Sequence, residues 1–155
     1  MNDKLAFVSF EFRDGRIRPF LSMEGLSRLR GDPEQVLSKA AKAYESRVRT
    51  MRALRTRIED ARRSGQLVRA RLVWRLGDAV YKLKEDLAHL SLELDGLYDH
   101  LQVALGVKPK WLQKVLSFRR HVPDEKLIPL SLSWGQCSRA PRRTAEQLTS
   151  RSIRR

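Results

Sequence analysis

Six polar side chains after Gly106 have the types and spacing of a nucleic-acid contact surface. The set comprises Lys108, Lys110, Gln113 and Lys114, followed by Arg119 and Arg120. Cationic side chains bind phosphate oxygens, and lysine, arginine and glutamine also hydrogen-bond to base edges in a major groove. On a helix, this spacing would place most of the set on one outward face. The residue types therefore predict contact with nucleic acid.

The segment 98–117, which carries most of this set, has the apolar spacing of two short helices joined by a tight turn. Its inward positions are Leu101, Leu105, Val107, Leu112 and Val115. Gly106 stands where the turn requires a residue that tolerates positive φ. The segment resembles the DNA-binding helix-turn-helix family, which implies a second helix in a major groove. Gln102 stands where that family has a small residue, and similar helix pairs also occur in proteins that bind nothing.

A second group of cations lies on a long predicted helix that begins at Asp32 and ends near Ser64–Gly65. Asp32 can cap the first turn, and Pro33 suits the first helical position. Apolar residues recur every three or four positions, and the remaining faces are rich in arginine, whose planar fork matches two phosphate oxygens. The candidate phosphate contacts are Arg49, Arg52 and Arg55. The alternative is a charged face that is simply solvated.

The whole pattern predicts a mainly α fold. We expect a helical bundle with a long N-terminal helical hairpin and a helix-turn-helix, plus a small N-terminal β-hairpin. Residues 1–30 form the β-hairpin and a connector, and residues 31–137 form the helical domain. Residues 138–155 are basic and poor in apolar side chains, which predicts a disordered tail that contacts phosphates through Arg142 and Arg143.

Two details of the helical domain follow from its pattern. A helix is expected over about Leu67–Leu90. It contains Gly77, and a glycine inside a helix usually marks the close approach of another helix. It also contains Trp74, which we expect in the core. The next helix is expected over Ser91–Leu105, as the first helix of the turn motif.

The composition favours a polyanionic partner. The chain has 155 residues, with 32 Lys plus Arg against 18 Asp plus Glu, and a formal net charge of +14. Such an excess repels itself, and a polyanion relieves that repulsion. No predicted helix has the wide apolar face of a membrane-surface helix. Nucleic acid is therefore the expected partner, with DNA favoured over RNA, and we expect no membrane contact.

The predicted location is the cytoplasm. No apolar run approaches the roughly 20 residues that span a bilayer. The N-terminus lacks the basic region, apolar block and cleavage site of a secretory signal. The single cysteine, Cys137, is expected to be an inert, partly buried thiol, which fits a reducing compartment.

We predict no enzymatic activity, metal, cofactor or small-molecule substrate. The histidines are His89, His100 and His121, whose separations place no two of them on one helical turn, and one cysteine completes no zinc site. Each adjacent acidic pair points its side chains roughly 100° apart on a helix, so no pair converges on one ion. A nucleic-acid hydrolase is therefore the least favoured function.

Two segments together resemble a bacterial family. Leu72–Gly77 is similar to the tryptophan-x-x-glycine helix of YhcG-like N-terminal domains. A later series of residues is similar to that family's helix-turn-helix and to its closing leucine-serine-tryptophan sequence. The series consists of Leu101, Gly106, Leu112, Phe118 and Leu132–Trp134. In that family the helical domain precedes a PD-(D/E)XK nuclease domain. The resemblance implies a module that binds nucleic acid or partner chains, whose nuclease half would be missing or supplied by another chain.

Two binding functions remain open. The first is DNA binding through the helix-turn-helix, with Lys108, Lys110, Gln113 and Lys114 at the groove. The second is a small helical subunit of a ribonucleoprotein or nuclease complex, of CRISPR or restriction type, in which the arginine helix and tail track a backbone without reading bases. The second requires a protein partner such as a nuclease or an effector-complex subunit.

Overall fold

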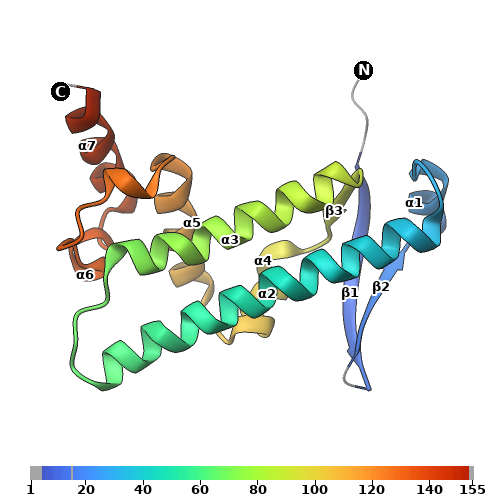
Figure 1. The fold of residues 1–155 in the computed structure, drawn as a ribbon, viewed down its shortest axis with the longest axis horizontal. Coiled ribbons are helices and arrows are strands. Elements are labelled where there is room, and N and C mark those ends of the chain that lie inside the picture. The colour runs from blue at the N-terminus through green and yellow to red at the C-terminus, as the bar shows by residue number, and fades with distance from the viewer. Residues whose placement is uncertain (1–4, 15, 154–155) are drawn as a thin grey trace.

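The computed structural model describes residues 5–14 and 16–153, and its fold is mainly α, as predicted (Figure 1). The elements in chain order are β1 (Ala6–Arg13), β2 (Arg16–Leu21), α1 (Met23–Arg28), α2 (Pro33–Arg63), α3 (Ala70–His89), β3 (Leu92–Leu94), α4 (Leu97–Leu105), α5 (Pro109–His121), the 3₁₀ turn η1 (Glu125–Leu127), α6 (Trp134–Cys137) and α7 (Pro141–Ile153). Residues 1–4, 15 and 154–155, which fall in the predicted N-terminal segment, hairpin turn and tail, lie outside the described residues.

The long helices α2 and α3 form the centre of the molecule, where they lie side by side and run in opposite directions (Figure 1). Asp32 caps α2 as expected, because its carboxylate accepts a hydrogen bond of 3.3 Å from the Glu34 amide. Met51 and Ile58 of α2 and Leu76 and Leu83 of α3 are almost completely buried. This apolar seam between the two helices is the core on which the other elements pack.

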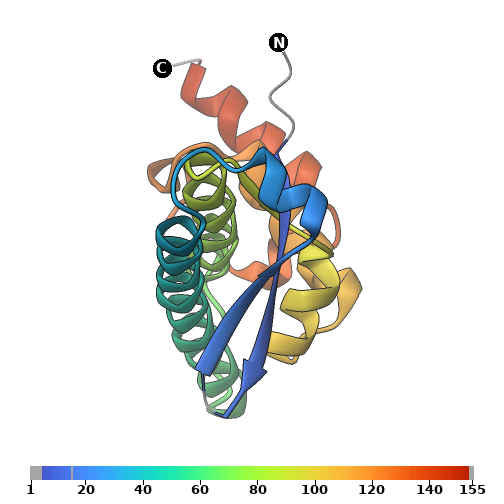
Figure 2. The ribbon, with the colours of Figure 1, turned by 90° about the vertical axis from the view of Figure 1, so that its right-hand side faces the viewer.

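A small sheet closes one end of the helix pair. β1 pairs antiparallel with β2, with Val8 opposite Leu21, and parallel with β3, with Ala6 opposite Leu92. In Figure 2 the strands β1 and β2 cross between the α2–α3 pair and α4. A lone two-stranded hairpin is marginal in water, so the third strand and the helices beneath supply its stability.

The strand β3 corrects the expectation of one helix over Ser91–Leu105. Ser91 adopts a φ of 60°, and its carbonyl accepts a hydrogen bond of 2.9 Å from the Ala6 amide. The helix α4 therefore begins only at Leu97. The leucine spacing fits a helix, but pairing with β1 stabilises an extended segment that local periodicity does not reveal.

The turn between α4 and α5 follows the predicted pattern. Gly106 adopts a φ of 62°, the inward residues Leu101, Leu105, Leu112 and Val115 are buried as predicted, and Val107 is half-buried. The close helix approach predicted at Gly77 is also present, because a Cβ there would lie 2.8 Å from the Arg119 Cβ. Trp74 is buried as predicted, and its indole Nε1 donates a hydrogen bond of 2.8 Å to the Val122 carbonyl.

The C-terminal segment corrects a second expectation, because residues 141–153 form the helix α7 in place of a disordered tail. Ala145 and Leu148 are buried, and the Thr149 hydroxyl donates to the His121 carbonyl at 3.3 Å. Two apolar residues three positions apart suffice to dock a short helix once α5 supplies a complementary surface. Among the helices described, none is long and apolar enough to cross a membrane.

Candidate nucleic-acid interface

The helices α5 and α7 form the walls of an open cleft of about 890 Å³, which we call the basic cleft. The residues that line it are Lys110, Gln113, Lys114, Ser117, Ala140, Pro141, Arg142, Arg143 and Glu146. Five of these are predicted contacts, and they come from two segments that are far apart in sequence. The basic cleft therefore joins the predicted groove-reading helix to the predicted basic tail.

The α5 wall follows directly from helical periodicity. Lys110, Gln113 and Lys114 are exposed, whereas Leu112 and Val115 are completely buried against the core. Residues three and four positions apart lie on one side of a helix, so the polar set shares a face opposite the buried one. Ser117 lies one turn further along that face and was not predicted as a contact, although the same spacing points to it.

The α7 wall carries its arginines at an electrostatically unfavourable place. Pro141, Arg142 and Arg143 begin the helix, and the first turn contains no acidic residue. Cations at a helix N-terminus interact unfavourably with the helix dipole, so this arrangement does not stabilise α7. An anion bound over the same turn would interact favourably with both the helix dipole and the two arginines. The position of these arginines therefore favours a role in ligand binding.

A single carboxylate faces the four cations of the basic cleft. Arg142 Nε lies 3.2 Å from Glu146 Oε1, with 73% of the arginine side chain and 58% of the glutamate side chain exposed. Exposed ion pairs of this kind contribute little free energy, because water screens them. A phosphate could therefore replace the Glu146 carboxylate as the partner of Arg142 at small cost.

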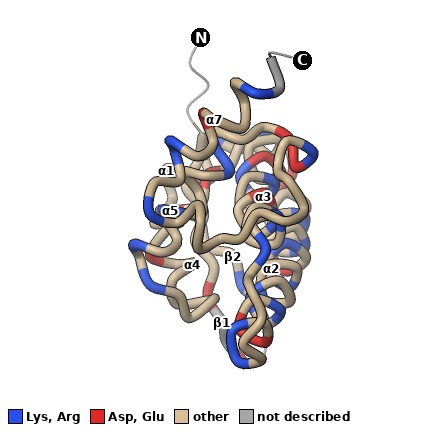
Figure 3. The backbone as a smooth tube through the Cα atoms, turned by 90° about the vertical axis from the view of Figure 1, so that its left-hand side faces the viewer, with Lys and Arg blue, Asp and Glu red and all other residues tan. Residues whose placement is uncertain are grey.

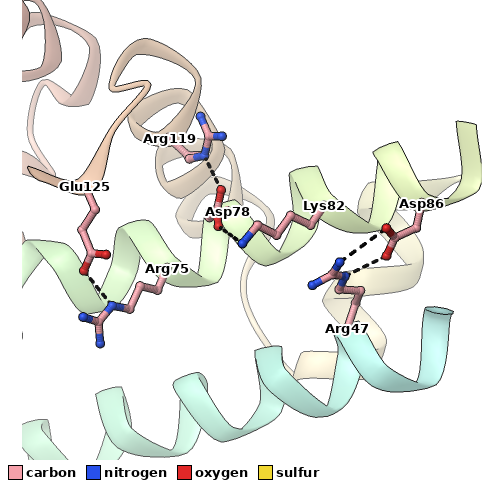
Figure 4. A network of polar contacts seen from close by, with 7 residues as sticks. All are labelled: Arg47, Arg75, Asp78, Lys82, Asp86, Arg119 and Glu125. Carbon is pink, nitrogen blue, oxygen red and sulfur yellow. Dashed lines mark hydrogen bonds and ion pairs between the residues drawn. The ribbon is translucent and has the colours of Figure 1, made fainter. Parts of the chain in front are cut away.

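Arg119 does not belong to the interface, which corrects its prediction as an outward contact. Its Nε donates to Asp78 Oδ1 at 3.0 Å, and only 18% of its side chain is exposed (Figure 4). Its guanidinium also lies 5.0 Å from the ring centre of Trp74 and 4.8 Å from that of Tyr81. The residue therefore holds α5 against α3. Arg120 is exposed but does not line the basic cleft.

Two of the α2 arginines bind the backbone of the turn motif. Arg52 Nε donates to the Ala104 carbonyl at 3.2 Å, and Arg55 Nη2 donates to the Gly106 carbonyl at 3.0 Å. These contacts fasten α2 to the end of α4. Arg49 is exposed and lies 3.5 Å from Glu45 within the same helix. None of the three lines the basic cleft, so the structure does not bring them together with its cations.

Lys108 lines a second and smaller concavity, which we call the turn pocket. This pocket has a volume of about 260 Å³ and lies where α2 meets the turn before α5. Its lining residues are Arg55, Ile58, Glu59, Arg62, Gly106, Val107, Lys108 and Trp111. Arg62 was not selected from the sequence, and nothing in its local spacing distinguishes it from the other arginines of α2.

Several other charges are engaged in ion pairs between elements. Arg47 Nε lies 2.8 Å from Asp86 Oδ2, and Arg75 Nε lies 2.7 Å from Glu125 Oε1 (Figure 4). The hydrogen bond that Arg47 donates to the Asp86 carboxylate is the main reason why the pKa of Arg47 is raised. Figure 3 shows that basic positions are spread over α2, α5 and α7. Only part of the positive charge is thus free to bind a ligand.

The titratable groups of the described interior include Cys137, Tyr44 and His100, whose pKa values are shifted by burial. Burial raises the pKa of the Cys137 thiol to about 11, so the thiolate is scarce at neutral pH. The Tyr44 hydroxyl and His100 Nε2 form a hydrogen bond, and burial raises the tyrosine pKa and lowers the histidine pKa. Within the described ranges, no three His, Cys, Asp or Glu residues come together to hold a metal ion.

Comparisons of the chain with models of known protein families, with curated proteins and with solved structures found no match. The resemblance to YhcG-like domains therefore stays a prediction.

Proposed function

We propose that this protein binds nucleic acid, with DNA as the favoured polymer, and that the basic cleft is its contact surface. The observation that carries the proposal is the convergence of Lys110, Lys114, Arg142 and Arg143 on one open concavity. Exposed lysine and arginine side chains that face a single carboxylate form a surface that attracts a polyanion. The partner that fits such a surface along two helices is a phosphodiester backbone.

The two walls would have different tasks on DNA. Gln113 lies between two lysines on the outward face of α5 and can form two hydrogen bonds with an adenine edge. Arg142 and Arg143 on α7 would hold the phosphates that flank the groove, because a guanidinium matches two phosphate oxygens. In this arrangement α5 supplies base contacts and α7 supplies affinity. The protein is proposed to bind without cleaving, and to act in the cytoplasm.

The principal test removes the charge of the basic cleft. A variant with Lys110→Gln, Lys114→Gln, Arg142→Gln and Arg143→Gln should bind a labelled DNA duplex roughly 100-fold more weakly at low salt. The matched control removes the same charge from α2, and its substitutions are Lys39→Gln, Lys42→Gln, Arg57→Gln and Arg63→Gln. The control should lose about threefold at most, because only the general field of the protein changes.

Salt dependence gives an independent readout of the same surface. Log affinity falls by about 0.7–0.9 for each phosphate contact per log unit of salt. A plot of log affinity against log salt concentration should therefore be less steep by about 3 for the four-residue cleft variant than for the wild type. Titrations of double- and single-stranded DNA and RNA at two salt concentrations measure both the slope and the preferred polymer. If the wild-type protein binds none of these polymers at low ionic strength, the proposal is wrong.

Base reading is tested separately by Gln113→Ala. Loss of a contact with two hydrogen bonds should cost about 1–3 kcal/mol of discrimination at one base position and little general affinity. Selection of preferred sequences from a random duplex library, with wild type and variant, measures that change. An unchanged preference would reject α5 as a reading helix and leave backbone binding.

The second candidate function is a backbone-binding subunit of a ribonucleoprotein or nuclease complex of CRISPR or restriction type. An apolar groove of about 520 Å³ beside β3 favours it, because Phe7 and Tyr98 line this groove and are exposed. A partner chain would cover such a surface. This candidate predicts binding without sequence preference and weaker binding in an Arg49→Gln variant. Co-purification with a nuclease or effector-complex subunit would support it.

A further inference from the structure

We infer that the turn pocket is a binding site for a phosphate group. Three cationic side chains, those of Arg55, Arg62 and Lys108, line it against the single carboxylate of Glu59, which leaves a net charge of +2. The volume of about 260 Å³ admits a phosphate group but not a folded partner. The pocket is distinct from the basic cleft, because the two concavities share no lining residue.

Two hydrogen-bond donors at this pocket lack an acceptor. Arg55 Nε and Trp111 Nε1 are buried nitrogen atoms with no hydrogen-bond partner in the part of the chain that the structure describes. Both residues line the turn pocket. Buried N–H groups in folded proteins are nearly always paired, because an unpaired donor loses its bond to water. A phosphate seated in the pocket would bring several acceptor oxygens to the two residues that carry these donors.

The pocket holds one of its cations in place before any ligand arrives. Arg55 Nη2 donates to the Gly106 carbonyl at 3.0 Å, so its guanidinium plane is fixed relative to the turn. A preorganised guanidinium loses less conformational entropy on binding than a mobile one. Lys108 and Arg62 are exposed and can move toward a bound anion.

Glu59 is the one group that opposes an anion in this pocket. Its Oε1 lies 3.4 Å from Arg62 Nη1, so part of its charge is already balanced within the wall. The first turn of α5 adds to the attraction, because Lys108 provides no side-chain cap for its free amide groups. The net positive charge that remains in the pocket favours a small, strongly charged anion over a neutral ligand.

The source of the phosphate rests on the proposed function, whereas binding of the phosphate group itself does not. A nucleic acid offers two sources, which are an internal phosphodiester and a terminal 5′-phosphate. Both present the same oxygens to Arg55, Arg62 and Lys108. Oligonucleotides of one sequence, with either a 5′-phosphate or a 5′-hydroxyl end, distinguish the two.

The first experiment titrates the full chain with inorganic phosphate and follows the indole N–H signals by NMR. The Trp111 signal should move in a saturable way, because this residue lines the pocket and its indole N–H has no acceptor among the described residues. The Trp74 signal should stay in place, because its N–H already donates to the Val122 carbonyl. Trp74 therefore serves as an internal reference within the same spectra.

The variants for this titration remove two exposed charges each. Arg62→Gln with Lys108→Gln should weaken phosphate binding roughly tenfold, the effect of losing charge-assisted hydrogen bonds. Arg57→Gln with Arg63→Gln is the matched control, since both residues are exposed on α2 and neither lines the pocket. The control should retain the wild-type phosphate affinity.

The second experiment repeats the titration with the two oligonucleotides. Movement of the Trp111 signal with both of them supports a backbone phosphate as the occupant. Movement only with the 5′-phosphorylated one supports a terminal phosphate. If the oligonucleotides bind while the Trp111 signal stays in place with them and with inorganic phosphate, the pocket inference fails and the proposed function survives.

The titration with inorganic phosphate can uphold the pocket inference even when the proposed function fails. If it moves the Trp111 signal while no polynucleotide binds, the pocket inference stands and the proposed function fails. The inference is overturned if phosphate leaves the Trp111 signal unmoved, or if the pocket variant responds as the wild type does.

Discussion

The surroundings of Asp78 and the basic cleft contain the same residue types in opposite settings. At Asp78, the carboxylate pairs with Arg119 and Lys82, and 15% of the Asp78 side chain is exposed. In the basic cleft, Arg142 pairs with Glu146, and both side chains are mostly exposed. The Asp78 pair joins α3 to α5, whereas the Glu146 pair lies within one helix.

The comparison shows that exposure, and not charge itself, separates arginines that hold elements together from arginines that remain available to a ligand. A largely buried ion pair whose partner is removed leaves an uncompensated charge in a poorly solvated place, which destabilises the fold. An exposed pair exchanges its partner for water or phosphate at little cost. Substitutions around Asp78 should therefore lower the stability of the fold, whereas substitutions of exposed charges in the basic cleft should change the affinity for DNA.

The largest expected effect is the loss of stability in an Asp78→Ala variant. Removal of the carboxylate leaves the Arg119 guanidinium between Trp74 and Tyr81 without its counter-ion, and should lower the free energy of unfolding by about 3 kcal/mol. Urea unfolding followed by far-UV circular dichroism measures this change. The control Glu45→Ala breaks the exposed pair with Arg49 and should cost less than about 0.5 kcal/mol. Equal costs in both variants would contradict the comparison.

A smaller loss of stability, joined to a loss of affinity, is expected for Leu148→Ala. This leucine is buried on α7, and its truncation should cost about 2 kcal/mol, at the low end for a buried leucine. Because α7 is one wall of the basic cleft, affinity for DNA should also fall several-fold. The exposed neighbour Gln147→Ala serves as the control for both measurements. Unchanged DNA affinity in Leu148→Ala would remove α7 from the interface.

The pH dependence of stability tests how burial affects a titratable group in the interior, His100. Burial lowers the pKa of His100 in the folded state, so the unfolded chain binds the proton more readily. The stabilising effect of neutral His100 is present above the unfolded pKa of about 6.5 and is lost as pH falls through and below it.

This pH effect is measured by comparing His100→Gln with wild type in urea unfolding at pH 7.5 and at pH 5.5. The wild type should lose more stability between the two values than the variant does. An identical pH dependence in both proteins would contradict the assignment to His100.

The smallest effect is a gain of affinity in Glu146→Gln. The substitution removes the only carboxylate among the lining residues of the basic cleft and should tighten DNA binding about two- to threefold at low salt. Fluorescence anisotropy titrations measure the change, and it should vanish at high salt. Weaker binding would mean that Glu146 orients Arg142 for its ligand.

Local signals predicted many of the elements correctly. Asp32 with Pro33 predicted the start of α2, and Gly106 predicted the turn before α5, because capping and positive φ are properties of a few neighbouring residues. Gly77 predicted a close helix contact, although the residue that it meets, Arg119, was assigned to the opposite face. The outward positions Lys110, Gln113 and Lys114 also followed from periodicity alone.

Three features required contacts between distant segments, and the sequence did not predict them. Leu92–Leu94 forms a strand only because β1 offers a free edge. Residues 141–153 form a helix only because α5 accepts Ala145 and Leu148. Arg119 turns inward only because Asp78, Trp74 and Tyr81 surround it. In each case the decisive partner is tens of residues away, where local patterns carry no information.

The amino-acid sequence by itself determined the excess of positive charge, the amphipathic helices and the turn at Gly106, since these depend on composition and on residues within a few positions. The tertiary structure alone decided which cations remain available to a ligand. Packing paired Arg119 with Asp78, fastened Arg52 to the Ala104 carbonyl, oriented Arg55 at the turn pocket through the Gly106 carbonyl, and brought α7 beside α5 to form the basic cleft. The physical reason is that exposure and ion pairing arise from the whole fold, whereas charge is carried by each residue.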